Sequence, residues 1–251
     1  MPSEVLLKKL MNAQSVVAFS GAGMSAESGV PTFRGNDGIW KKFKPEELAN
    51  FDAFMRNPNL VWEWYRHRKQ IIATIQPNQG HVALAEMERF YEKMTVITQN
   101  IDNLHRRAGS KTVYELHGNI ERNYCIDCGQ RYTNQEILMC DEAPRCSTCN
   151  GLIRPDVVWF GELLPEHDWE MSVAAAQNAD LFLSIGTSGV VYPAASLPMT
   201  ARQSGAYVVE INIEPTELSH RVDETILGKS GEILPKFVEF LKSSRVKQEN
   251  S

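Results

Sequence analysis

The chain has 251 residues, 43% of them hydrophobic and 23% charged, which suits one large soluble domain or a domain carrying a smaller insert. The formal net charge of −5 argues against a specific nucleic-acid partner, and no run of about 18 apolar residues is present that would cross a membrane. The first residues resemble neither a signal peptide nor a mitochondrial presequence, and the five cysteines cluster between residues 125 and 149. These features predict a cytoplasmic protein, which we expect to be a monomer.

Short apolar runs alternate with helical patterns along most of the chain, after an amphipathic helix in residues 1–15. We predict strands at residues 16–19, 94–102, 112–118, 180–188 and 206–214. Helices are predicted at residues 80–92, 168–178 and 232–242, followed by a frayed polar tail. This alternation predicts an α/β fold with a Rossmann-like, mostly parallel sheet.

Two segments interrupt the alternation. Residues 36–76 are helical in pattern, and residues 119–155 carry the cysteines. We predict that together they form a smaller lobe, a helical insert plus a cysteine module. The Rossmann-like domain then consists of the three remaining segments, residues 1–35, 77–118 and 156–251.

The helical stretch "VWEWYRHRKQII", residues 61–72, raises a question about charge. With each residue advancing about 100° around the helix, its apolar side chains cover an arc of roughly 160°, and Arg68 falls near the middle of that arc. A buried cation needs a partner. The wheel leaves two alternatives open: an internal glutamate such as Glu46 or Glu47, or the anionic group of a ligand.

Polar and small residues gather where the predicted strands end. They are Ser20, Gly21, Gln99, Asn100, Asp102, His117, Gly186, Thr187, Ser188 and Asn212. In parallel sheets, ligands bind outside the carboxyl ends of the strands. The glycines of "SGAGMSAESG" do not match the G-x-G-x-x-G fingerprint, and an ordinary tight turn is the alternative. Two phosphate-compatible loops and a candidate ribose ligand, Asn212, nevertheless favour a dinucleotide.

His117 follows the strand pattern "TVYEL" and precedes a glycine. A histidine suits a general base near neutral pH, although a lone strand-end histidine is often structural. His105 is the second candidate, but it lies inside the next predicted helix. Asp102 has its own alternative role as an ordinary helix cap.

The cysteines form a metal-ligand pattern. "CIDC" at 125–128 and "CSTC" at 146–149 are separated by 17 residues, which matches the spacing of a zinc site. Four sulfur ligands leave no open position, so Cys125, Cys128, Cys146 and Cys149 predict one structural zinc. Unliganded cysteines or two disulfides are the alternatives. Cys140 is expected to be a plain free thiol, and the segment has no dense basic patch for nucleic acid.

Taken together, these motifs resemble those of the sirtuins, NAD-dependent protein lysine deacylases. The matching blocks include "GAGMSAESGVPTFRG" (21–35), "TQNIDNLHRRAGS" (98–110), "ELHG" (115–118), both cysteine pairs, "VVWFGE" (157–162), "GTSGVVYPAASLP" (186–198) and "EIN" (210–212). The resemblance spans nearly the whole chain. It implies that NAD is consumed as a co-substrate, giving free lysine, nicotinamide and O-acyl-ADP-ribose.

The resemblance also implies a role for individual residues. His117 is the implied general base, with Asn100 and Asp102 as further catalytic residues beside the nicotinamide. The implied NAD site comprises Gly21, Ala22, Gly23, Ser25, Glu27, Thr32, Phe33, Arg34, Trp40, Gln99, Asn100, Ile101, Asp102, His117, Gly186, Thr187, Ser188, Asn212, Ile213, Glu214 and Ser230. The acyl-lysine protein is implied to add a strand between two edges of the enzyme. Those edges carry Val158, Trp159, Phe160, Gly161, Glu162, Gly189 and Val190.

One sirtuin branch prefers succinyl, malonyl and glutaryl groups, and the present chain is similar to it in the acyl pocket. The branch has a Y-x-x-R motif, here Tyr65 and Arg68, and a small residue about sixteen positions earlier, here Ala49. The resemblance implies that the acyl carboxylate is the partner of Arg68, with a second hydrogen bond from Tyr65. Acetyl groups are expected to be removed as well. Mono-ADP-ribosyl transfer and a non-enzymatic NAD-sensing module remain as alternatives.

Overall fold

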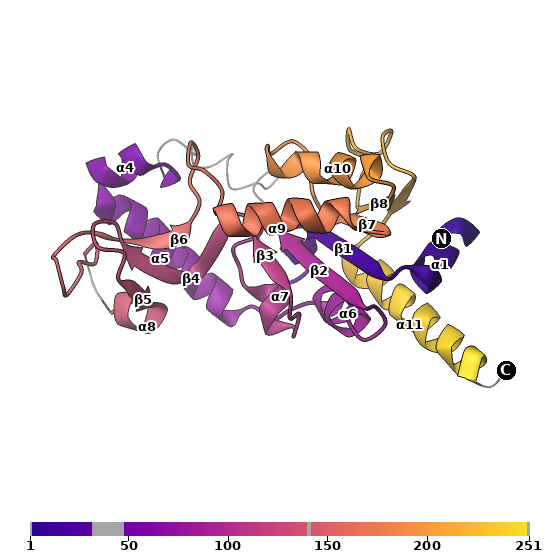
Figure 1. Ribbon diagram of the computed structural model, residues 1–251. Helices are drawn as coiled ribbons and strands as arrows, with labels where there is room; N and C mark the ends of the chain where they lie inside the picture. Colours follow the sequence, from indigo (N-terminus) through magenta and orange to yellow (C-terminus); the bar gives the residue numbers. More distant parts are fainter. Residues whose placement is uncertain (1, 32–47, 140–141, 250–251) are drawn as a thin grey trace.

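The computed structural model describes residues 2–31, 48–139 and 142–249 of the chain. Its central element is a six-stranded sheet in the order β3-β2-β1-β7-β8-β9, in which every pair is parallel (Figure 1). The strands are β1 (Ser15–Ser20), β2 (Lys93–Thr98), β3 (Val113–Glu115), β7 (Leu181–Ile185), β8 (Tyr207–Asn212) and β9 (Glu224–Leu227). The predicted α/β class is confirmed, and β9 is a strand that the sequence pattern did not indicate.

Helices cover both faces of this sheet. α1 (Glu4–Asn12), α6 (Gln79–Met87) and α11 (Ser230–Glu249) share one apolar core with the sheet. α9 (Glu166–Gln177) and α10 (Leu197–Gln203), the latter preceded by the 3₁₀ turn η2 (Ala194–Ser196), pack on the opposite face. Because both faces are covered, β1 and β7 are almost entirely buried, as their continuous apolar runs predict.

The last helix corrects one prediction. The polar tail was expected to fray after residue 242, yet α11 continues to Glu249. Arg245 donates a hydrogen bond to the carbonyl of Phe90 at 2.9 Å, and its guanidinium lies over the Phe90 ring. This contact holds the polar end of the helix against the body of the protein, which an apolar periodicity does not reveal.

A second lobe lies beside the large sheet (Figure 1). It contains α4 (Phe51–Arg56), α5 (Pro58–Thr74), α8 (Asn134–Ile137) and a three-stranded antiparallel sheet in the order β5-β4-β6. The strands of this small sheet are β4 (Gly118–Cys125), β5 (Arg131–Thr133) and β6 (Ile153–Val157). One apolar core joins side chains of α4, α5 and the cysteine module. The domain boundaries given above stay a prediction, and residues 36–47 of the expected helical insert lie outside the described residues.

The loop after β1 lies directly against the loop after β7. The backbone N–H of Gly23 donates to the carbonyl of Gly186 at 2.8 Å, and that of Gly21 donates to Ile185 at 3.0 Å. Gly186 has a φ of +57°, and a Cβ there would lie 2.4 Å from the backbone nitrogen of Met24. The short helix α2 (Ala22–Ala26) therefore begins in backbone-to-backbone contact, which requires glycine on both sides.

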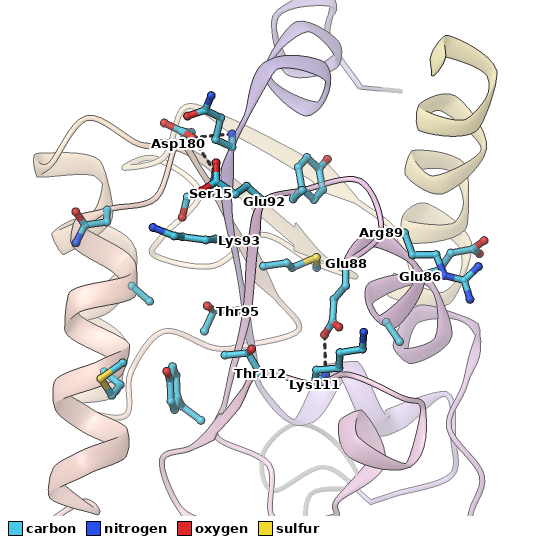
Figure 2. Close-up of a pocket in the computed structure, with 18 of the residues that line it drawn as sticks. Ser15, Glu86, Glu88, Arg89, Glu92, Lys93, Thr95, Lys111, Thr112 and Asp180 are labelled. Carbon is cyan, nitrogen blue, oxygen red and sulfur yellow. Dashed lines mark hydrogen bonds between the residues drawn. The ribbon is translucent and has the colours of Figure 1, made fainter. Parts of the chain in front are cut away.

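A broad open groove lies at the other edge of the sheet, where the strands begin (Figure 2). Ser15 and Lys93, the first residues of β1 and β2, line it between α6 and α9. The carboxylate of Asp180 accepts hydrogen bonds from the backbone of residues 14 and 15, and that of Glu88 from the backbone of Lys111. The carboxylates of Asp180 and Glu88 thus stabilise the backbone around the groove. No helix in the described part of the chain is long and apolar enough to span a membrane.

We predict that Gly186→Ala destabilises the protein by at least about 2 kcal/mol more than Gly205→Ala, measured by urea unfolding. Gly205 also has a positive φ, of +101°, but a Cβ there meets nothing within 4 Å. The two variants share the backbone penalty, so the difference isolates the contact with the glycine loop. Equal losses of stability would show that the close approach is not a constraint.

Candidate functional site

The carboxyl ends of four strands meet at one place. Gln99, just after β2, donates its backbone N–H to Ser20 at the end of β1. Its side-chain amide donates to the hydroxyl of Thr187, after β7, at 3.1 Å. Asn212, the last residue of β8, donates to the carbonyl of Thr187 at 3.0 Å. The polar residues expected at these strand ends are thus brought together, with Thr187 at their centre.

Next to this junction, Ser25, Asn100 and Asp102 form a buried polar group. The side-chain amide of Asn100 donates to the carbonyl of Gly21 at 2.9 Å and to the hydroxyl of Ser25 at 3.1 Å. Ser25 in turn donates to the carboxylate of Asp102. Burial raises the pKa of Asp102, whereas hydrogen bonds from Ser25 and from the backbone of Leu104 oppose the shift. Asp102 thus makes the predicted cap to Leu104 and also contacts Ser25 of the polar group.

Two buried histidines, His81 and His105, lie close to this polar group. His81 accepts the backbone N–H of Asn78 at its Nδ1, so its Nε2 carries the proton and points to the hydroxyl of Ser25 at 3.5 Å. Burial lowers the pKa of His81 to about 4, so its ring is neutral at physiological pH. No sequence motif indicated His81 as a site residue. Its one sequence signal is its position three residues after the capping Asn78, and that pattern by itself indicates only the start of a helix.

His105, the second candidate for the base, is not placed for that role. Its ring is 2% exposed, and its Nε2 lies 2.8 Å from the hydroxyl of Ser20, which donates onward to Thr98. Burial and the neighbouring His81 hold the pKa of His105 well below its usual value. A neutral ring enclosed in this way supports the strand ends and has no access to a substrate.

His117 lies just after β3 and is only partly buried. Its Nδ1 lies 2.9 Å from the carbonyl of Gln99, and a carbonyl only accepts, so Nδ1 carries the proton. The lone pair is then on Nε2, the nitrogen on the other side of the ring. Burial lowers the pKa of His117, and the Gln99 carbonyl partly offsets that shift. The ring is therefore neutral, oriented and able to accept a proton.

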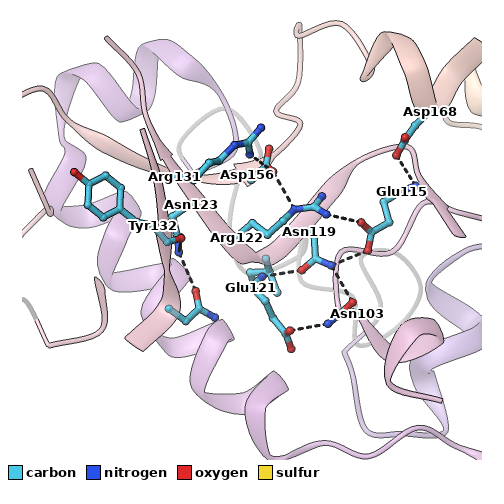
Figure 3. A network of polar contacts seen from close by, with 12 residues as sticks. Asn103, Glu115, Asn119, Glu121, Arg122, Asn123, Arg131, Tyr132, Asp156 and Asp168 are labelled. Atoms are coloured by element: carbon cyan, nitrogen blue, oxygen red, sulfur yellow. Dashed lines mark hydrogen bonds and ion pairs between the residues drawn. The ribbon is translucent and has the colours of Figure 1, made fainter. Parts of the chain in front are cut away.

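A polar network fixes the chain on both sides of this histidine (Figure 3). The buried carboxylate of Glu115, in β3, accepts hydrogen bonds from Asn119 at 2.6 Å and from Arg122 at 2.8 Å, both in β4. The backbone N–H of Glu115 donates to Asp168 of α9 at 2.9 Å. Arg122 also pairs with Asp156 of β6 at 3.0 Å. The large sheet and the cysteine module are thus joined at the segment that carries His117.

The four predicted zinc ligands come together. All four sulfur atoms lie within 4.8 Å of one another, with Cys125 to Cys149 at 3.4 Å and Cys128 to Cys146 at 3.5 Å. A disulfide needs about 2 Å, so two disulfides do not describe this arrangement. Tetrahedral zinc with Zn–S bonds of about 2.3 Å places sulfurs about 3.8 Å apart, which these positions fit. Cys140 lies outside the described residues.

Tyr65 and Arg68 lie one turn apart on α5, and both are buried, with 1% and 8% of their surface exposed. The guanidinium of Arg68 lies 4.8 Å from the centre of the Trp64 ring. Burial lowers the pKa of Arg68, and electrostatic interactions with Tyr65 and Asp102 act against that shift. Arg68 is thus a buried cation on the same helix as the buried Tyr65. Glu46 and Glu47, its alternative partners, lie outside the described residues.

The remaining predicted residues fall into three groups. Those at an exposed or partly exposed rim are Ala22, Val158, Phe160, Gly161, Ser188, Gly189, Val190, Ile213 and Glu214. A second group makes contacts within the protein. The carbonyl of Ala49 accepts the N–H of Phe160, while Ile101 and Trp159 lie in the core of the small lobe. Glu162 pairs with Arg154, and Glu27 accepts a hydrogen bond from Ser230. Those outside the described residues are Thr32, Phe33, Arg34 and Trp40.

Comparison with known proteins decides the family. The pattern of the Sir2 family matches residues 21–193, which include the glycine loop, His117 and all four zinc-ligand cysteines. The chain belongs to the Sir2 family. A relative from Pyrococcus furiosus, named NAD-dependent protein deacylase, is 51% identical over 240 residues, covering 94% of this chain and 96% of its own.

Solved structures agree with this assignment to the Sir2 family. A Sir2 homologue in complex with NAD superposes with a TM-score of 0.89 at 41% identity, over 97% of this chain and 95% of that chain. A Sir2 protein solved with a deacetylated p53 peptide and 3′-O-acetyl-ADP-ribose gives a TM-score of 0.86 at 37% identity, over 95% and 98% of the two chains. The fold and the zinc module are those of the Sir2 family.

We predict that the purified protein contains one zinc per chain by elemental analysis. Cys128→Ser is expected to lose the metal and at least about 3 kcal/mol of unfolding free energy, because a structural site contributes its binding energy to folding. Cys140→Ser is the matched control and should keep both. Retention of full zinc by Cys128→Ser would contradict the four-cysteine site.

Proposed function

We propose that this protein removes acyl groups from lysine side chains of proteins in a reaction that consumes NAD and yields nicotinamide and O-acyl-ADP-ribose. The observation that carries the proposal is the oriented, neutral His117 beside the polar group of Ser25, Asn100 and Asp102. The name of the Pyrococcus relative and the ligands of the solved Sir2 homologues support it.

The strand-end residues fit a dinucleotide. No side chain intervenes where Gly23 meets Gly186, so a ligand can approach the backbone there, and Asn212 and Ser188 flank the loop of Thr187. We assign the nicotinamide to the group of Ser25, Asn100 and Asp102 and the adenosine half to the loops after β7 and β8. Bound NAD supplies the ribose carbon that accepts the acyl oxygen as nicotinamide departs.

Side chains of the protein then carry out the proton transfer. Nε2 of His117 takes the proton of a ribose hydroxyl, while the bond from Nδ1 to the Gln99 carbonyl stabilises the charge that the ring acquires. Asp102 and Asn100 hold the pocket in one arrangement through Ser25. The substrate peptide lies between residues 157–162 and 189–192, where Phe160 and Val190 are exposed.

Product analysis tests this function. Purified protein, NAD and an acylated peptide should give equal amounts of deacylated peptide, nicotinamide and O-acyl-ADP-ribose by mass spectrometry. Transfer of ADP-ribose to an unmodified protein, without loss of the acyl group, would favour the transferase alternative. NAD binding without turnover would favour the sensor.

His117 predicts the acidic limb of the pH profile. The base must be neutral, so kcat/KM falls as the pH drops through the His117 pKa, and burial places that pKa below 6.5. His117→Ala should lose at least about 100-fold in kcat/KM and lose this limb. His105→Asn is the comparison, since it alters a buried histidine with no access to substrate. An acidic limb unchanged in His117→Ala would show that another group is the base.

We further propose that succinyl and malonyl groups are preferred over acetyl. Tyr65 and Arg68 present a hydroxyl and a guanidinium from one face of α5, and the small Ala49 belongs to the same buried cluster as Tyr65. The guanidinium is desolvated, which strengthens its attraction for a carboxylate. We therefore assign the carboxylate at the far end of the acyl chain to the guanidinium of Arg68 and the hydroxyl of Tyr65.

Arg68→Met tests this preference. We expect kcat/KM for a succinyl-lysine peptide to fall about 10- to 150-fold, which is the worth of hydrogen bonds to a charged group. The ratio of kcat/KM values for the succinyl and acetyl forms of the same peptide should fall by a similar factor. Arg66→Met is the matched control, because Arg66 lies on the same helix and donates to the backbone of Glu142. A ratio that is unchanged in Arg68→Met would refute the acyl proposal.

A further inference from the structure

Trp159 points into the small lobe, away from the rim on which its neighbours lie. Its ring is 2% exposed, whereas Phe160, the next residue, is 52% exposed. The indole Nε1 of Trp159 donates a hydrogen bond of 2.8 Å to the hydroxyl oxygen of Tyr65. Phe160 of this loop is therefore exposed on the side proposed to bind the peptide. Trp159 of the same loop contacts Tyr65, a residue of the predicted acyl pocket, from the interior of the small lobe.

The position of Trp159 is fixed on several sides. The guanidinium of Arg154 lies 3.5 Å from the centre of its ring, and Arg154 pairs with Glu162 at 2.5 Å. Glu162 also accepts the backbone N–H of Trp159 at 2.7 Å. Phe54 packs against the ring with centroids 5.2 Å apart. The direction of the indole N–H is therefore set by a closed set of contacts within the small lobe.

This bond determines which way the hydroxyl of Tyr65 donates. An indole nitrogen is a donor only, so the proton of Tyr65 cannot point back toward Trp159. Burial raises the pKa of Tyr65, so the phenol keeps its proton at neutral pH. A phenol that already accepts a hydrogen bond is also a better donor, because such bonds strengthen one another in a buried site.

We infer that Trp159 is a positioning residue for acyl specificity: its indole N–H holds the Tyr65 hydroxyl so that the phenol donates to the carboxylate of a succinyl or malonyl group. This inference rests on the proposed acyl preference. It goes beyond that preference by making the loop that borders the peptide also a determinant of the acyl pocket. The backbone N–H of Val158, in the same loop, donates to the carbonyl of His117 at 3.0 Å, so the loop is held on the catalytic side too.

The test is a double-mutant cycle read as the ratio of kcat/KM for succinyl and acetyl forms of one peptide, with NAD. Trp159→Phe keeps a large ring and removes the N–H, and should lower the ratio about 3- to 10-fold, the effect of one lost hydrogen bond. Tyr65→Phe should lower it at least as much. Adding Trp159→Phe to Tyr65→Phe should change the ratio no further, because the hydroxyl that Trp159 orients is gone.

Trp62→Phe is the matched control. Trp62 is a buried tryptophan of the same lobe, and its Nε1 donates to the carbonyl of Ile153 at 2.8 Å. It undergoes the same chemical change without a bond to Tyr65. An equal fall of the ratio in Trp62→Phe would mean that loosening of the lobe, and not the Tyr65 hydroxyl, sets selectivity, and would overturn the inference.

The remaining outcomes separate the two proposals. If Tyr65→Phe and Arg68→Met lower the ratio but Trp159→Phe does not, the inference fails and the acyl preference stands. If neither Tyr65→Phe nor Arg68→Met lowers it, the acyl preference fails and the inference falls with it. Additive effects in the cycle would show that Trp159 acts by a route other than Tyr65.

A measurement on the unaltered protein covers the case in which Trp159→Phe does not fold. The chain has five tryptophans, so ¹⁵N-indole spectra are simple, and the Trp159 signal is the one displaced most in Tyr65→Phe. A succinyl-lysine peptide should shift this signal, and the acetyl form of the same peptide should shift it much less. Equal shifts with both peptides, or none with either, would contradict the inference.

Discussion

The site depends on one backbone contact, that between the glycine loop after β1 and Gly186 after β7. The N–H of Gly23 donates to Gly186, and neither side has room for a Cβ. This contact brings together the loops that follow two neighbouring parallel strands. Thr187, the next residue, then bonds Gln99 after β2 and Asn212 at the end of β8.

Three histidines near the carboxyl ends of the strands, His81, His105 and His117, differ in how deeply they are buried. His81 and His105 are enclosed and neutral; His105 contacts Ser20 at the end of β1 and His81 contacts Ser25 in α2, so both rings hold these serines in place. His117 is held by one nitrogen only and is partly exposed. The same residue type thus supplies structure in two places, whereas the ring of His117 is held through Nδ1 alone, and the difference lies in what each ring nitrogen contacts.

The small lobe links two regions that are far apart in the sequence, helix α5 and the segment that carries His117. The zinc module supplies β4 and β6, and β6 carries Arg154, which stacks on Trp159. Trp159 contacts Tyr65 of α5, while Arg122 of β4 contacts Glu115 near His117. The cysteine module therefore contacts Trp159, the partner of Tyr65, through Arg154 and the segment that carries His117 through Arg122.

Much of this architecture follows from sequence pattern, and the failures have physical causes. The five buried strands are apolar runs, and their polar ends, from Ser20 to Asn212, were predicted because parallel strands end at a common edge. β5 and β9 are short and only partly apolar, so they give no clear period, and β4 is longer but has several polar residues. The predicted second strand continued to residue 102, but β2 ends at Thr98, where Asn100 turns inward to bond Gly21.

Other features arise only from tertiary contacts. The inward position of Trp159 cannot be read from "VVWFGE", since alternation along an irregular loop is not fixed. The wheel placed Arg68 on a buried face, and the structure agrees, but the wheel could not show that Tyr65 accepts a hydrogen bond from Trp159. The hydrogen bond that orients His117 joins residues 18 positions apart and has no sequence signal.

The most direct measurement is steady-state kinetics of the unaltered enzyme on one peptide whose lysine is either succinylated or acetylated, with nicotinamide release followed as a function of NAD. The account predicts NAD-dependent turnover of both forms and a kcat/KM at least about tenfold higher for the succinyl form. A higher kcat/KM for the acetyl form would show that Arg68 serves the protein and not the acyl group. Absence of NAD-dependent turnover of either form would contradict the proposed chemistry itself.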